Sequence, residues 1–227
     1  MEQFLKNKNA LLYVLILSSI YCVTLVLFRV AYSHSIMFIF LIWNLFLAWI
    51  PYFVSIVILK YENRKRPITG LIVLVICWLA FLPNAPYILT DLFHLEDRQN
   101  IPLWYELILI ASFAWTGLML GYFSLYNVHN AITQRFGKIT GWIFSLFSIS
   151  ACSFGVYIGR FLRWNSWDII YNPKGLTKDI LERIMDPYGN KGAYIMTILL
   201  TVLLILGYAT IKIVYDNRQN EKKIINN

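Results

Sequence analysis

The sequence predicts an all-α integral membrane protein with six transmembrane helices, the third broken near its outer end, and a short interfacial helix in the fifth loop. Composition is the first observation behind this prediction: 59% of the 227 residues are apolar and only 14% are charged. Soluble domains carry about 45–50% apolar and about 25% charged residues. A soluble fold of this size cannot bury such an apolar excess, because much of its surface must stay in contact with water. The composition excludes a soluble enzyme, a secreted disulfide scaffold and a disordered chain.

The second observation is a series of six apolar stretches, each longer than the roughly 18 residues that indicate a spanning helix. None of them has the polar face of a surface helix in a soluble protein. The stretches are 10–28, 35–59, 68–90, 107–128, 139–159 and 192–211, in a single membrane domain that ends in a short cytoplasmic tail, 212–227. We expect the first stretch to be a retained helix, because it exceeds the ~7–15-residue apolar core of a cleaved signal peptide.

Charge is the third observation, and it predicts the orientation. The chain carries a net charge of +8 from 20 Lys and Arg against 12 Asp and Glu. No nucleic-acid partner is expected, since membrane proteins gather Lys and Arg in their cytoplasmic loops. Twelve Lys and Arg flank the spans on the side of the termini, and eight lie on the other side, six of them in the loop Arg160–Lys191. The count predicts a cell-membrane protein with both termini in the cytoplasm.

The third span contains a candidate site at its outer end. Pro83 and Pro86 remove backbone donors and leave carbonyl groups without partners, which is tolerated at membrane depth only inside protein or beside a wet cavity. Asn84 can satisfy some of these carbonyls, and Asp91 and His94 follow with the i, i+3 spacing of one helix face. The alternative is an ordinary proline kink followed by an exit loop.

The fifth span ends in a second polar segment, which we expect to reach the same outer face. Arg160 and Arg163 lie four residues before Trp164 and Trp167, the spacing of a cation–π pair if the helix continues. Arginine binds phosphate and carboxylate with a planar fork that lysine lacks. The alternative is a pair of snorkelling arginines with an aromatic anchor. The candidate ligand-binding residues are Asn84, Asp91, His94, Arg160, Arg163, Asn165 and Asp168.

The loop after the fifth span contains an amphipathic segment between Pro173 and Pro187. Five apolar residues fall on one helical face, and Lys178, Asp179, Glu182 and Arg183 fall on the other; the apolar residues are Leu176, Ile180, Leu181, Ile184 and Met185. This pattern is typical of a helix lying in the membrane interface. A water-exposed lid helix is the alternative.

Small residues form a stripe along each of the fourth and fifth spans, and each stripe contains a G-x-x-x-G unit. The units are Gly117/Gly121 and Gly155/Gly159. Because small residues let helix backbones approach closely in lipid, we expect these two spans to contact each other along the glycines. A homo-oligomer formed through the same faces is the competing interpretation.

Two long strings carry a family resemblance: PNAPYILTDLFHL in the third span and GRFLRWNSWD after the fifth, with WYE at the start of the fourth. The chain resembles a bacterial multi-pass membrane family known as domain of unknown function 1361, from about the second span to the sixth. The resemblance implies a bacterial integral membrane protein and supplies no substrate, cofactor or reaction.

Metal and thiol chemistry have little support in the sequence. Asp91, His94, Asp168, Glu96 and His34 could approach the outer face, but no His-x-x-x-His or Glu-x-x-His pair occurs, and no metal or cofactor is expected. Metal-dependent intramembrane hydrolysis therefore remains only a minor alternative. The three cysteines lie inside spans, where a thiol stays protonated, and indicate neither a disulfide framework nor a zinc cluster.

Two hypotheses of different classes remain for the polar residues. In the first, they bind an anionic, lipid-linked or phosphorylated ligand, as part of an enzyme or a carrier in contact with membrane lipid. In the second, they form a neutralised ion-pair network in a structural or accessory subunit. Intramembrane charges are usually functional, but ion-pair networks can also be structural.

Overall fold

The computed structural model describes residues 2–96 and 101–225, and the side chains of residues 10–96 and 101–217. This described part is helical and contains no strand. Six helices are long and apolar enough to span a membrane, which confirms the predicted fold class. Five of the spans lie in single helices: α1 (Glu2–Ser33), α2 (Phe40–Asn63), α5 (Leu103–Phe136), α6 (Lys138–Phe161) and α9 (Lys191–Ile225). The third span, Ile68–His94, begins with the 14-residue α3 (Ile68–Phe81) and continues through two short helices. The short ones are α4 (Asn84–Tyr87), the 3-10 helix η1 (Ile88–His94), α7 (Asp168–Tyr171) and α8 (Pro173–Met185).

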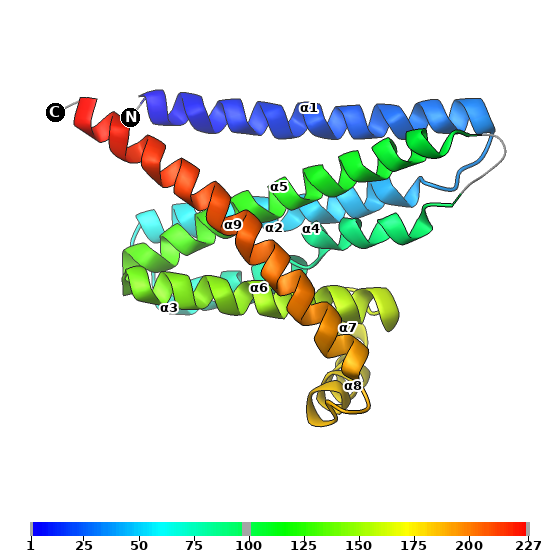
Figure 1. Cartoon of the computed structure of the whole chain (residues 1–227). Helices are drawn as coiled ribbons and strands as arrows, with labels where there is room; N and C mark the ends of the chain where they lie inside the picture. Colours follow the sequence, from blue (N-terminus) through cyan, green and yellow to red (C-terminus); the bar gives the residue numbers. More distant parts are fainter. Residues whose placement is uncertain (1, 97–100, 226–227) are drawn as a thin grey trace.

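The long helices form a bundle with both termini at one end (Figure 1). We call this end the termini side, and the opposite end, where α1, η1 and α6 finish, the loop side. α5 is the central helix: 50% of its most apolar window is buried, against 17% in α1 and in α9. The outward surfaces of α1 and α9 expose large apolar side chains, as helices that face lipid do.

Several helices run beyond the apolar stretches. α5 begins after Pro102 and ends at Gly137, whose φ of 91° is the left-handed conformation that glycine adopts without strain. α9 continues through the predicted cytoplasmic tail to Ile225, and residues 226–227 lie outside the described part. Lys212 is buried there and bonds Asp216 at 2.9 Å between Nζ and Oδ2. The apolar stretches underestimate the length of these helices, because residues in the membrane interface can be polar and still helical.

The third span is broken at the predicted place. α3 ends at Phe81, and after Leu82 and Pro83 the chain continues as α4 and then as the tighter η1. The amide of Asn84 donates a hydrogen bond to the Phe81 carbonyl oxygen at 2.9 Å. This contact satisfies one of the groups that the break releases, as expected for Asn84.

Spans four and five contact each other as predicted, since Gly141 of α6 faces Thr133 and His129 of α5. The predicted location of this contact along the two glycine pairs is wrong, because both pairs pack against residues 83–88. A Cβ added to Gly117 would lie 2.6 Å from the Ala85 carbonyl oxygen, and one added to Gly155 would lie 2.6 Å from Pro83 Cγ. The short helix thus occupies both faces, because two prolines and an alanine make it narrow enough to fit between α5 and α6. Each of these four glycines therefore has a close neighbour among residues 83–88 of the same chain.

We expect the change Gly117→Ala to destabilise the bundle by about 1–3 kcal/mol, the usual cost of overpacking. The added methyl would meet backbone, which cannot turn away. The matched control is Gly192→Ala, whose Cβ meets nothing within 4 Å. Thermal unfolding in detergent measures both changes, and equal midpoints for the two variants would contradict the packing of α4 on α5.

Candidate functional site

Three of the predicted site residues meet on the loop side. Arg160 Nη1 lies 3.3 Å from Asp91 Oδ1, and Arg160 Nη2 lies 3.2 Å from His94 Nε2. Asn44, from α2, donates its amide to Asp91 Oδ2 at 2.9 Å. The cluster of Asn44, Asp91, His94 and Arg160 therefore joins α2, η1 and α6, and we call it the loop-side cluster.

The loop-side cluster is a nearly dry ion pair in which the polar groups face one another. The Asp91 side chain is 1% exposed and that of Arg160 14% exposed. Because a guanidinium only donates hydrogen bonds, Nε2 of His94 accepts the bond from Arg160. Arg160 also lies over the ring of Phe93, 5.4 Å from its centroid, and His94 packs edge-on against Phe40. An aromatic ring thus lies against each of Arg160 and His94.

Asn84 belongs to a neighbouring contact rather than to the ion pair. Its amide also donates to Ser166 Oγ at 3.0 Å, and Ser166 Oγ donates to the Ala80 carbonyl oxygen at 2.9 Å. These bonds attach the segment after α6 to the break in the third span. Arg163 lies in this segment, three residues before Ser166.

Arg163 does not form the predicted helical pairing with Trp167. α6 ends at Phe161, and Arg163 has a φ of 61°, a left-handed conformation that non-glycine residues seldom adopt. Its side chain is exposed, with no hydrogen bond or ion pair to any residue that the structure describes. The predicted pairing of Arg160 with Trp164 is replaced as well, because Trp164 Nε1 donates to Asp179 Oδ2 in α8 at 2.7 Å.

Asn165 and Asp168 form a local turn, and no hydrogen bond or ion pair joins either of them to Asp91 or Arg160. The Asn165 backbone N–H donates to Asp168 Oδ2 at 2.7 Å, at the start of α7. Such local bonds between an Asp side chain and nearby backbone are typical of turns. This bond engages the Asp168 carboxylate, which could otherwise have neutralised Arg163.

Sequence reasoning missed two parts of this region. Asn44 gave a usable signal, since it is a lone amide within the uncharged stretch 35–59. Arg29 and Glu106 form a second ion pair, with 2.8 Å between Nη2 and Oε1 and with side chains that are 2% and 0% exposed. Arg29 also lies 4.5 Å from the Phe38 ring centroid, which adds a cation–π contact. Because Glu106 pairs with Arg29, it is not the partner of Arg160.

The described residues hold no group of three or more His, Cys, Asp or Glu side chains that could bind a metal ion. The predicted alternative of metal-dependent hydrolysis has no ligand set among them. His129, on the termini side, bonds Ser145 Oγ through Nδ1 at 2.7 Å and is remote in sequence and in the bundle from His94.

Comparison with known proteins gives one match. A family model described as "Protein of unknown function (DUF1361)" matches residues 43–206, well over half of the chain. No curated protein and no solved structure matches significantly. The matched range includes all four residues of the loop-side cluster and all of α8.

Proposed function

The chain is a multi-pass membrane protein that belongs to the DUF1361 family of proteins of unknown function, and we propose that its loop side binds an anionic phosphate group between Arg160 and Arg163. The phosphate would belong to a lipid headgroup or to a lipid-linked molecule. The proposal covers an enzyme or a carrier, since both begin with this binding step.

The observation that carries the proposal is the unpaired charge of Arg163. Asp91 neutralises Arg160, the Asp168 carboxylate is used in its own turn, and Glu106 pairs with Arg29. Arg163 thus keeps an exposed guanidinium three positions after Arg160 in the chain. A strained backbone at a non-glycine residue is often found at binding sites, where the surrounding structure maintains it. Two guanidinium groups, of which the described residues pair only Arg160 with a carboxylate, favour an anion that accepts several hydrogen bonds.

One observation favours the second hypothesis, a structural or accessory subunit. Both carboxylate oxygens of Asp91 accept hydrogen bonds, and both terminal nitrogens of Arg160 donate them. Such mutual satisfaction is what a helix-packing network requires. Arg163 distinguishes the two hypotheses: it binds the anion in the first, and it has no part in the ion-pair network of the second.

The charge count leads us to propose that the loop side is extracytoplasmic, with both termini in the cytoplasm. The variant Tyr188→Cys tests this, since that side chain is 86% exposed on the loop side. We expect a membrane-impermeant thiol reagent to label it in intact cells. Labelling only after the inner face is opened would mean that the topology is inverted. Gln99, in the other loop on this side, lies outside the described residues.

The change Arg163→Gln tests phosphate binding with little risk to the fold, because this side chain makes no described contact. Losing a charge-assisted hydrogen bond of about 1.5–3 kcal/mol should weaken phosphate binding roughly tenfold or more. Native mass spectrometry of protein titrated with phosphatidylglycerol, and separately with inorganic phosphate, measures the loss and distinguishes lipid from free anion. The matched control Lys178→Gln removes the same charge from an exposed site in α8 and should keep the affinity. Equal losses in the two variants would refute the site.

A further inference from the structure

α8 is the element of the loop side that the bundle supports least. It lies to the side of the bundle, beside the end of α6 and the start of α9 and far from α1, so it does not cover the end of the bundle as a lid would (Figure 1). None of its 13 residues is buried. An isolated helix of this length is only marginally stable in water. We propose that the lipids on this face of the membrane cover its apolar side.

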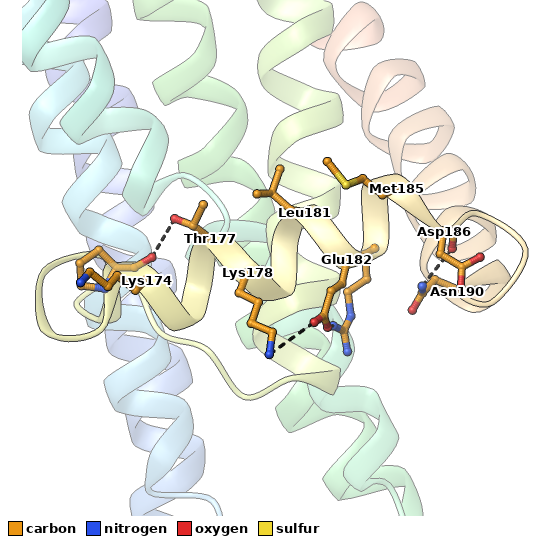
Figure 2. A pocket seen from close by; sticks show the side chains of 10 residues that line it. Lys174, Thr177, Lys178, Leu181, Glu182, Met185, Asp186 and Asn190 are labelled. Atoms are coloured by element: carbon orange, nitrogen blue, oxygen red, sulfur yellow. Dashed lines mark hydrogen bonds and ion pairs between the residues drawn. The ribbon is translucent and has the colours of Figure 1, made fainter.

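The apolar and the charged side chains of α8 point to opposite sides, as this proposal requires. In Figure 2, α9 is the pale orange helix beyond Asn190, and it leads away from α8. Leu181 and Met185 point in the same direction. Lys178 and Glu182 point to the opposite side. Because α9 spans the membrane, its direction marks the membrane interior, so the apolar side of α8 faces inward and its charged side faces water.

The apolar side of α8 continues a surface that already faces lipid. Ile184 is 54% and Met185 77% exposed, and the first turns of α9 expose Ile195 by 58%. An exposed apolar patch of this kind marks an interaction surface, and here it adjoins a spanning helix. Outer parts of acyl chains are therefore the occupant that the position favours.

Specific contacts hold α8 at this depth. Asp179 accepts a hydrogen bond from Trp164, directly after α6, and also pairs with Arg183 at 3.5 Å. At the start of α8 the Asn172 side chain accepts from the Gly175 N–H at 3.1 Å, which caps the helix. The helix is thus fastened to the end of a spanning helix through its polar side, which leaves the apolar side for lipid.

The charge of this segment indicates whether apolar burial or electrostatic attraction drives its contact with lipid. Between Asp168 and Asn190 the basic residues are Lys174, Lys178 and Arg183, and the acidic ones are Asp168, Asp179, Glu182 and Asp186. The segment is nearly neutral, so apolar burial rather than attraction to anionic headgroups must drive the contact. We therefore expect it to withstand high salt, whereas a polybasic segment would be released.

Spin labels test the proposal on the full chain in phosphatidylcholine nanodiscs. One label replaces Met185 and the matched control replaces Lys178, in each case with exposed Cys77 changed to Ser. We expect severalfold greater collision with oxygen than with a water-soluble nickel complex at position 185, and the reverse at position 178. The difference should persist in about 1 M salt, where the Debye length is only about 3 Å.

Three results would overturn the proposal: equal access to the nickel complex at both positions, shielding of position 185 from both reagents, or loss of the difference at high salt. The first would mean a water-exposed helix, the second a covering protein surface and the third electrostatic docking. None of them bears on Arg163, so the phosphate site can fail while α8 lies in lipid, or the reverse. The variant Met185→Asp provides a second measurement: we expect a lower thermal midpoint in nanodiscs than for Lys178→Asp.

Discussion

Replacing Glu106 with Gln should lower the free energy of unfolding by about 3–5 kcal/mol, the usual cost of leaving a buried charge without its partner. Arg29 would keep its positive charge while only 2% exposed, with an amide in place of the carboxylate 2.8 Å away. Its Nε already lacks a hydrogen-bond partner among the described residues, so little is available to compensate. Reversible unfolding in mixed micelles measures the loss.

Two controls identify the cause. The double change Arg29→Met with Glu106→Leu removes both charges and should recover most of the stability, since apolar residues can replace a buried pair at little cost. The change Glu182→Gln breaks the Lys178–Glu182 pair, whose side chains are 77% and 51% exposed. Exposed pairs contribute about 0–1 kcal/mol, so this variant should unfold almost as the native chain does. A double variant as unstable as Glu106→Gln would contradict the ion-pair explanation.

The second large effect is expected at Arg160. The change Arg160→Ala removes the only described cation beside Asp91, which is 1% exposed, and should destabilise the protein by about 3–5 kcal/mol. Arg160→Lys keeps the charge near Asp91 but cannot reach His94 and an anion at once, because an ammonium lacks the planar fork. This variant should fold and insert normally while phosphate binding falls. Thermal unfolding in detergent compares the two variants.

The sequence predicts the spans and the break in the third one well, because hydropathy and proline act locally. The positions of Pro83, Asn84 and Asp91 along one helix follow from their spacing alone. The partners of the two glycine pairs cannot be predicted from spacing. The choice between α4 and a neighbouring span depends on where the chain goes after the break in the third span. The sequence could indicate that Gly117 needs a close neighbour but not that the neighbour is Ala85.

Only part of the site was predicted, because its remaining contacts also depend on how the helices are arranged in space. Asp91, His94 and Arg160 meet because two helix ends reach the same side, which topology implies. Asn44 comes from a third helix whose rotation no local pattern reveals, and Arg29 and Glu106 are 77 positions apart. Arg163 was expected to continue a helix; α6 instead ends two residues earlier, and the exposed arginine that results is the basis of the proposed function.

Phosphatidylglycerol binding by the Arg160→Lys variant, measured by native mass spectrometry beside its thermal midpoint, tests the central claim most directly. If the loop side binds phosphate, this variant should keep a near-native midpoint and lose roughly tenfold or more in affinity, the consequence of losing a charge-assisted hydrogen bond of about 1.5–3 kcal/mol. If the variant binds the lipid as tightly as the native chain while Arg160→Ala fails to fold, Arg160 serves the packing of the helices and the proposed binding site is wrong.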